Sequence, residues 1–524
     1  MSITNKDLGD SLKKPPQSYW LASAGQTSFP KLERDIDVDV AIVGGGLAGI
    51  TCALLLKREN LKVAVLEADR IGQGTTGHTT AKITSQHSLI YYKIKQALGE
   101  ELARQYADAN ETAIRTIAGL VEELNIDCDF VRQPAYVFTQ QEQYIQKIQD
   151  EAETAKKLGI VASYMDTIPL SLQAKAAVRF DNQAQFHPRK YLLALAAQIE
   201  GDGSYIFEHT RMVDLEEGQS CTVISEASNK VTARYVIIAS HFPFYDGKGM
   251  YFARLHPERS YALGVKVKQK YPGGMYITAE DPGRSIRSQK VEDGEMLIVG
   301  GEHHKTGHGE NLRNHYKVLL DFADATFQVE QLRYRWSTQD YGTLDDVPYA
   351  GRLTSKTPNI FVATGFYKWG MTNSTASASI IRDLIVRGSS LWADVYDPSR
   401  KDIAASAKTF VKENADVAVS LASGKLQPPE KALEDIKAGK AAVVAIDGQK
   451  MGAYRDEENN LHVIDTTCTH MGCEVKWNDA ERTWDCPCHG SRFTYEGEIV
   501  EGPAHKKLKH SGEGKNDIDP NIFN

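Results

Sequence analysis

Cysteine is scarce in this chain of 524 residues, and its scarcity excludes one broad class of protein. There are seven cysteines, and three of them, Cys52, Cys128 and Cys221, stand alone. Isolated cysteines are typical of small buried side chains in a reducing compartment, not of a secreted disulfide scaffold. The first twenty residues also lack the apolar core of a secretory signal. Together these features predict a cytoplasmic protein.

Long apolar runs and stretches of basic charge are missing as well. No run approaches the roughly 18 apolar residues that a membrane span requires. The net charge is −8 and no stripe of lysine or arginine stands out, which argues against nucleic acid as a partner. A composition of 41% hydrophobic and 25% charged residues is that of a globular protein. The chain is too long for one core, so several structural units are expected.

A glycine-rich turn is present near the front of the chain. The β-branched run Val38–Val43 suits a buried parallel strand, and Gly44-x-Gly46-x-x-Gly49 follows it and leads into an apolar helical stretch. A second strand ends on Glu67, 18 residues beyond Gly49. Glycines let the backbone approach a pyrophosphate at the helix N-terminus, and the acid can bind ribose hydroxyls. The order of these parts predicts a dinucleotide site, although the motif alone does not separate FAD from NAD.

Two later segments extend this site. Residues 68–84, "ADRIGQGTTGHTTAKIT", are rich in glycine and threonine and can lie along a cofactor. Residues 359–386 give another buried strand, a glycine-containing turn and a helix of small residues. A nucleotide fold that returns to its cofactor some 300 residues downstream is typical of two-domain flavoproteins.

Over roughly residues 36–395 the chain resembles the glycine-oxidase/D-amino-acid-oxidase-like (DAO) family of FAD-dependent oxidoreductases. The resemblance is carried by the N-terminal glycines, "GQGTTG", "FHPRKYLLALA", "FEHTRM", "YVIIAS", "DDVPYAG" and "ATGFYKWGMT", in the family's order. It implies an α/β (α+β) two-domain fold, with a Rossmann-like nucleotide domain and an antiparallel-sheet substrate domain. The FAD-binding parts would be about 36–90, 191–245 and 341–396, and the substrate domain about 91–190 and 246–340.

The resemblance also implies an extended FAD and names its contacts. The ADP half would lie on the N-terminal turn and near Met212, the pyrophosphate and flavin along the threonine-rich segment, and the isoalloxazine near the turn before the late helix. The implied residues are Gly44, Gly46, Gly49, Glu67, Ala68, Thr75, Thr76, His78, Thr79, Thr80, Ala81, Met212, Gly365, Gly370, Met371 and Thr372. In relatives that oxidise N-methylated glycines, a histidine placed like His78 is bonded covalently to the flavin. The alternative is a histidine that hydrogen-bonds within its own loop.

Four cysteines and two histidines gather in "CTHMGCEVKWNDAERTWDCPCHGS", residues 468–491. Cys468-x-His470 and Cys486-x-x-His489 are separated by fifteen residues, and each half carries one cysteine and one histidine. Zinc is the alternative metal, but the paired ligands of zinc usually stand further apart in the sequence than Cys-x-His. Two cysteines on one iron and two histidines on the other suit a [2Fe-2S] cluster. The segment closely resembles the Rieske signature.

The Rieske resemblance accounts for the remaining pair, Cys473 and Cys488. They match the places where respiratory-type Rieske proteins carry a disulfide, and ring-hydroxylating oxygenases usually lack this pair. Short strands with glycine and asparagine turns predict a small antiparallel β-domain over about 424–512. The other expected segments are an N-terminal extension, 1–35, a helical linker, 397–423, and a tail, 513–524.

A flavin and a Rieske cluster in one chain predict an amine or amino-acid dehydrogenase that passes single electrons to an external acceptor. The alternatives are a reductase module fed by NAD(P)H or a partner protein, a Rieske oxygenase, and a scaffold with relict cofactors. A second GxGxxG, usual in pyridine-nucleotide reductases, is not present, and "HHKTGH" is not an obvious two-histidine, one-carboxylate iron site. The candidates for contact with the substrate are Tyr276, Arg284, Arg287 and His303, the arginines as clamps for a carboxylate.

Overall fold

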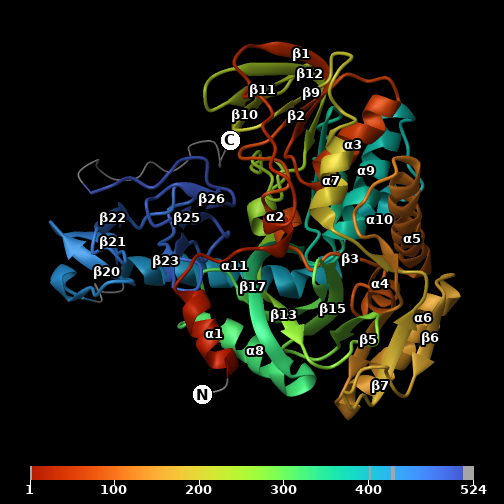
Figure 1. The fold of residues 1–524 in the computed structure, drawn as a ribbon. Helices are drawn as coiled ribbons and strands as arrows, with labels where there is room; N and C mark the ends of the chain where they lie inside the picture. The colour runs from red at the N-terminus through yellow and green to blue at the C-terminus, as the bar shows by residue number, and fades with distance from the viewer. Residues whose placement is uncertain (1–2, 401–402, 427–430, 512–524) are drawn as a thin grey trace.

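The computed structural model describes residues 3–400, 403–426 and 431–511 (Figure 1). The predicted tail, 513–524, lies outside these residues. One eight-stranded sheet holds the glycine-rich turn, and its main path runs β10-β11-β12-β1-β2-β9. The central strands β12, β1 and β2 are parallel, and β2 and the C-terminal ends of β1 and β12 are buried, as is typical of a parallel sheet covered by helices. Its strands are β1 Ile36–Val43, β2 Val63–Leu66, β9 Tyr205–Phe207, β10 Met212–Glu216, β11 Cys221–Ser225, β12 Lys230–Ile238, β18 Tyr349–Arg352 and β19 Ile360–Thr364.

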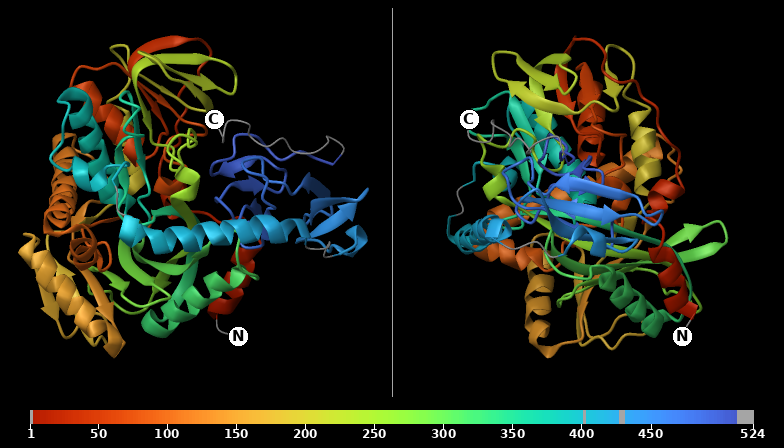
Figure 2. Two further views of the ribbon diagram at one scale, coloured as in Figure 1. Left: turned by 180° about the vertical axis from the view of Figure 1, so that it is seen from behind. Right: turned by 90° about the vertical axis from the view of Figure 1, so that its left-hand side faces the viewer.

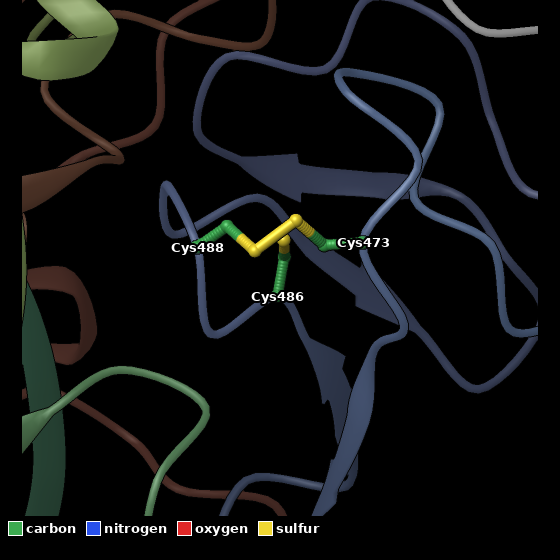
Figure 3. Close-up of side chains that lie close together, drawn as sticks. All are labelled: Cys473, Cys486 and Cys488. Atoms are coloured by element: carbon green, nitrogen blue, oxygen red, sulfur yellow. A yellow bond between two sulfur atoms is a disulfide. The ribbon is translucent and has the colours of Figure 1, made fainter. Parts of the chain in front are cut away.

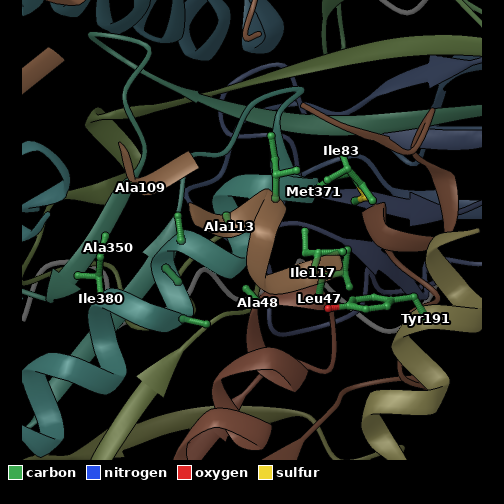
Figure 4. Close-up of a cluster of buried hydrophobic side chains, with 14 of the residues drawn as sticks. Leu47, Ala48, Ile83, Ala109, Ala113, Ile117, Tyr191, Ala350, Met371 and Ile380 are labelled. Atoms are coloured by element: carbon green, nitrogen blue, oxygen red, sulfur yellow. The ribbon is translucent and has the colours of Figure 1, made fainter. Parts of the chain in front are cut away.

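Helices cover this sheet and form the largest core. Small residues on α9 let it pack closely on α3, and α5 packs on α9 from the other side. Figure 4 shows Leu47 and Ala48 of α3, Ala113 and Ile117 of α5 and Met371 of α9 in this buried cluster. The helices around it are α2 Tyr19–Ala22, α3 Leu47–Arg58, α4 Ile90–Leu98, α5 Glu100–Glu123, α7 Pro188–Ala196, α9 Gly370–Val386 and α10 Ala393–Tyr396.

A second eight-stranded sheet has the order β17-β13-β16-β15-β14-β5-β7-β6 and is antiparallel except between β14 and β5. Helices α1 Ile3–Leu12, α6 Ile145–Lys157 and α8 Arg313–Phe327 pack on it. The mixed α/β architecture predicted from the sequence is confirmed. The strands are β5 Ala135–Thr139, β6 Ala162–Met165, β7 Ala176–Phe180, β13 Leu255–Val267, β14 Met275–Thr278, β15 Arg284–Val291, β16 Gly294–Lys305 and β17 Val329–Thr343; β3 Lys82–Ile83, β4 Val131–Arg132 and β8 Ala184–Gln185 form a small separate sheet.

The C-terminal part forms an all-β lobe beside these two sheets, and the long helix α11, Ile403–Leu426, leads out to it (Figure 2). Its core surrounds Trp484 and Phe493. Among the described residues, no helix is both long and apolar enough to cross a membrane. The strands of the lobe are β20 Lys440–Ile446, β21 Gln449–Arg455, β22 Leu461–Asp465, β23 Lys476–Asn478, β24 Thr483–Asp485, β25 Arg492–Thr494 and β26 Ile499–Glu501, paired as two antiparallel sheets.

Candidate active site and metal centre

A cavity of about 1160 Å³ extends from the glycine-rich turn to the C-terminal lobe. Its lining includes Gly44 and Glu67, residues of the short helix η1, Thr75–His78, and Glu501 of β26. The cavity thus touches both eight-stranded sheets and the lobe. A space of this kind suits a long cofactor together with a small substrate.

The turn after β1 is built for close backbone approach. Gly44 has φ +114°, and a Cβ there would lie 2.4 Å from the carbonyl oxygen of Ala239. A Cβ on Gly49 would lie 1.9 Å from the carbonyl oxygen of Gly44, so no larger residue allows α3 to start against the strand. The Glu67 carboxylate accepts hydrogen bonds from the backbone N–H groups of Gly45 at 2.6 Å and Asp69 at 2.9 Å. Burial raises the pKa of Glu67, and these two N–H groups oppose the rise.

Most residues expected to hold FAD face this cavity. They are Gly44, Gly46, Glu67, Ala68, Thr75, Thr76, His78, Thr79, Thr80, Met212, Gly370 and Met371.

Four expected contacts, Gly49, Ala81, Gly365 and Thr372, are not part of the lining. Thr372 lies behind it, and its Oγ1 donates a hydrogen bond to the carbonyl oxygen of Thr84 at 2.9 Å. Gly365 has φ +74°, and a Cβ there would lie 2.4 Å from Cγ2 of Thr343. The residues that do line the cavity fit an extended dinucleotide.

The η1 segment is fixed from several directions. Thr76 Oγ1 accepts the backbone N–H of Leu47 at 3.2 Å, and the Trp336 indole donates to the carbonyl oxygen of His78 at 2.8 Å. The Nδ1 of His78 lies 2.9 Å from the carbonyl oxygen of Gly74. This is the contact expected of a histidine that hydrogen-bonds within its loop. Burial lowers the pKa of His78, so the ring is neutral and Nδ1 is the donor.

The expected substrate residues divide between the cavity and the interior. His303 and Arg284 line the cavity, although Arg284 is already paired with Glu302, with Nη2 and Oε1 2.6 Å apart. Tyr276 is fully buried and stacks on Tyr136 with ring centroids 4.7 Å apart. Arg287 is also fully buried and donates to the carbonyl oxygen of Ala81 at 2.6 Å. Neither side chain lines the cavity, so neither is placed to contact a substrate there.

Among the charged cavity residues that sequence reasoning missed, Lys82, Glu258 and Asp340 lie within strands. Lys82 is nearly buried, and burial lowers its pKa to about 7. Asp340 is 3% exposed, and burial raises its pKa to about 7. The signal available in the sequence is a charged residue within a strand that is otherwise buried, which is rare without a functional or structural reason.

The four expected metal ligands, Cys468, His470, Cys486 and His489, are all buried in the C-terminal lobe. The rings of His470 and His489 have centroids 4.9 Å apart. The Cys486 thiol donates a hydrogen bond to the Cys468 sulfur and thereby lowers the pKa of the Cys468 thiol. Two buried cysteines and two buried histidines on neighbouring loops are a donor set that fits a [2Fe-2S] cluster.

The two loops are joined by the disulfide between Cys473 and Cys488, as predicted (Figure 3). The sulfur of Cys486 lies beside this bridge, and the three sulfurs are within 4.8 Å of one another. Cysteines closed in a disulfide are not thiolate ligands, so this trio is not a separate metal site. The bridge holds the loops together and leaves Cys486 for the metal centre.

The two histidines face the rest of the chain and are each only 2% exposed. Tyr341 Oη donates to the carbonyl oxygen of His489 at 3.0 Å, and Gln339 Nε2 donates to that of Gly490 at 2.8 Å. Asp246 Oδ2 lies 3.5 Å from Nε2 of His470. The metal-binding loops are therefore docked on β17 and on the segment after β12.

Comparison with known proteins agrees with both halves of this description. Residues 39–384 match the family DAO, FAD dependent oxidoreductase, and residues 428–511 match the Rieske [2Fe-2S] domain. The chain is 44% identical over 497 residues to the Rieske 2Fe-2S iron-sulfur protein YhfW of Bacillus subtilis (strain 168), covering 95% of this chain and 98% of that protein.

Two further matches concern the first part of the chain. Gamma-glutamylputrescine oxidoreductase of Escherichia coli (strain K12) is 24% identical, over 72% of this chain and 91% of its own length. The structure of glycine oxidase from Geobacillus kaustophilus superposes with a TM-score of 0.60 at 18% identity, covering 70% of this chain and 99% of that one. The match to glycine oxidase is a likeness of fold.

Proposed function

Because this chain belongs to the DAO family of FAD-dependent oxidoreductases and also carries a Rieske [2Fe-2S] domain, we propose that it is an amine or amino-acid dehydrogenase. It would oxidise a substrate C–N bond to an imine and send the electrons one at a time to an external acceptor. When bound, FAD takes two electrons as a hydride, whereas the cluster carries single electrons. The names of two similar proteins, an oxidoreductase of gamma-glutamylputrescine and an oxidase of glycine, support a substrate with an amino group.

The observation that carries the proposal is the continuous contact between the cavity and the metal-binding loops. Thr75 Oγ1 in the cavity wall lies 3.4 Å from Nδ1 of His241. The His241 ring packs on the Tyr341 ring with centroids 4.8 Å apart. The Tyr341 hydroxyl donates to the backbone of His489. Packed side chains thus join the two cofactor regions within one chain, as internal electron transfer needs.

Gly44, Gly46 and Glu67 would hold the ADP half of FAD, and η1 would lie against its pyrophosphate or flavin. Cys468 with Cys486 and His470 with His489 would hold the two irons of the cluster. In domain terms, 36–396 would be the FAD-dependent part and 424–512 the Rieske part, linked by 397–423.

Anaerobic absorption spectroscopy of the purified protein tests this function. Amines, N-methylated amino acids and D-amino acids are added in turn, followed by NADH and NADPH. We expect an amine to bleach the flavin band and the cluster band to change afterwards. Bleaching by NAD(P)H with no response to any amine would contradict the proposal and favour a reductase module.

A further inference from the structure

A buried carboxyl group without a protein partner faces the cavity. Asp340 lies near the end of β17, lines the cavity, and is 3% exposed. Across the part of the chain that the structure describes, no hydrogen bond or ion pair reaches its side chain. The backbone carbonyl of Gln339, its neighbour, accepts a hydrogen bond from Thr75 Oγ1 at 3.1 Å. Asp340 therefore stands beside the segment assigned to the flavin.

A second carboxylate, Glu258, stands directly opposite Asp340 in the register of β13 and β17 and also lines the cavity. Unlike Asp340, it has partners: the Tyr367 hydroxyl donates to it, and Lys368 Nζ lies 3.5 Å away. These two groups lower the pKa of Glu258 although burial opposes them. Glu258 thus stays ionised as part of a fixed group.

The surroundings of Asp340 act differently. Burial raises its pKa to about 7, and the negative charges of Glu258 on β13 and Glu501 on β26 add to the rise. Lys368, after β19, and Arg259 on β13 oppose it. Two facing carboxyl groups with separated pKa values are the usual arrangement where one holds charge and the other exchanges a proton.

We propose that Asp340 binds the ammonium group of the substrate and accepts one of its protons. This inference rests on the proposed function and narrows the substrate to a compound that enters as a cation at its reacting nitrogen. A buried carboxylate is costly without a cation beside it, and no described side chain supplies one by direct contact. An ammonium group in the cavity would complete the site.

The proton transfer needs no group other than Asp340 and the substrate. A carboxylate oxygen of Asp340 takes one proton from the substrate nitrogen, which leaves a neutral carboxylic acid and a neutral amine. The freed nitrogen lone pair stabilises the positive charge that develops on the adjacent carbon as a hydride leaves it. The oxidant is the FAD of the proposed reaction. An ammonium substrate, which has no lone pair, would not react.

Ligand binding tests the assignment without relying on turnover. The oxidised holoprotein is titrated with short n-alkylammonium ions, with n-butanol and butyrate as neutral and anionic probes, and the flavin absorption is recorded. For the wild type we expect a perturbation by the ammonium ions alone. Their affinity should rise about tenfold between pH 6 and pH 8, as Asp340 ionises.

Asp340→Asn should weaken ammonium binding by about tenfold or more at pH 8 and remove the pH dependence. Asp281→Asn, which neutralises an exposed carboxylate at the cavity rim, is the matched control and should behave as the wild type. Lys368→Met removes the cation that lowers the pKa of Asp340. The pH at which ammonium binding is half-maximal should therefore be higher in this variant than in the wild type. Retained flavin and cluster absorption shows that each variant has folded.

The results separate this inference from the proposed function. Three results would overturn the role of Asp340. They are equal ammonium affinity in the wild type and Asp340→Asn, wild-type binding of butyrate as tight as that of ammonium, or no change of the wild-type flavin absorption with ammonium. If no amine reduces the flavin but ammonium binding still depends on Asp340, the proposed reaction fails and the binding site stands. If amines reduce the flavin of the wild type and of Asp340→Asn at the same rate, the reaction stands and the role of Asp340 fails.

Discussion

At the scale of single residues, Asp340 links the chemistry of the cavity to the stability of the fold. Its folded pKa of about 7 lies above the ordinary value of 3.8, so the folded state keeps a proton that the unfolded chain has released. Stability therefore falls as the pH rises from about 4 to about 7 and does not recover above that. At pH 8 the buried charge of Asp340 therefore lowers the free energy of unfolding of the wild type.

Asp340→Asn should thus be more stable than the wild type at pH 8, by about 1–5 °C in Tm, and no more stable near pH 4. Thermal unfolding of the holoprotein at both pH values measures the difference. The buried Asp345, whose Oδ1 lies 2.7 Å from Nη2 of Arg400, supplies the control. Asp345→Asn should lower Tm at pH 8, since it breaks a buried ion pair. A lower Tm for Asp340→Asn at pH 8 would contradict the assigned pKa.

Glu67 is proposed to bind the ribose of FAD, and its substitution tests that role. Its carboxylate is held by two backbone N–H groups at the end of β2, where it can accept hydrogen bonds from ribose hydroxyls. Glu67→Ala should weaken FAD binding by about 10- to 100-fold, the value of one or two hydrogen bonds to a charged group. Flavin content after dialysis measures this. Glu59→Ala, at an exposed position after α3, should keep its flavin; equal retention by both variants would count against the role of Glu67.

The four cysteines of the C-terminal lobe should divide into two classes. Cys486→Ser should lose the cluster, because it removes a proposed iron ligand. The double variant Cys473→Ala/Cys488→Ala should keep iron and sulfide but unfold more easily, by about 3 kcal/mol for a bridge that closes a loop of this length. The sequence separation of the bridge is 15 residues. Iron and sulfide content together with thermal unfolding decide the point; loss of iron in the double variant would mean that the bridge is part of the metal site.

At the scale of elements, the turn between β16 and α8 holds the second metal-binding loop in place. Gly307 has φ +72°, and a Cβ there would lie 2.6 Å from the backbone nitrogen of Pro487. Gly307→Ala should loosen the loop and speed hydrogen exchange over residues 486–491. Gly309→Ala in the same turn is a matched control, because Gly309 also has a positive φ, of +92°, but its Cβ would meet only Leu312. Equal exchange in both variants would show that the turn does not hold the loop.

Elements with a local signature were predictable from the sequence. The β1–turn–α3–β2 unit was predicted because strand, glycines, helix and acid follow one another within about thirty residues. The metal-binding loops were predicted because Cys468-x-His470 and Cys486-x-x-His489 carry their chemistry in a few positions. In both cases the chemistry depends on residues that are neighbours in the chain.

The sequence does not show which face of a strand a side chain occupies, so roles that depend on that face were not predictable. Tyr276 and Arg287 are expected to contact the substrate, but they lie on β14 and β15 and are fully buried outside the cavity. Adjacent residues of a strand point to opposite faces, so an error of one position reverses the assignment. Between β13 and β17 the register also shifts near Gly264, which breaks the alternation. The role of Asp340 becomes visible only when Glu258 is placed opposite it.

At the scale of the whole molecule, buried charges hold the Rieske part against the second sheet. Arg259, 1% exposed, reaches across to Glu501, with Nη1 and Oε1 3.3 Å apart, and Glu501 also pairs with Arg492. Arg492 in turn pairs with the buried Asp485 at 3.1 Å. Removing one member of such a network leaves an uncompensated charge, so the network favours a single docked arrangement. In that arrangement both histidines of the metal centre face the FAD-binding part of the chain.

Freeze-quench EPR spectroscopy during anaerobic mixing with a reducing amine shows whether electrons pass from the flavin to the cluster inside one chain. The reduced-cluster signal is followed over a range of protein concentrations. The docked arrangement predicts a rate of cluster reduction that does not change with protein concentration. A rate that rises in proportion to protein concentration would mean transfer between molecules and would contradict the account.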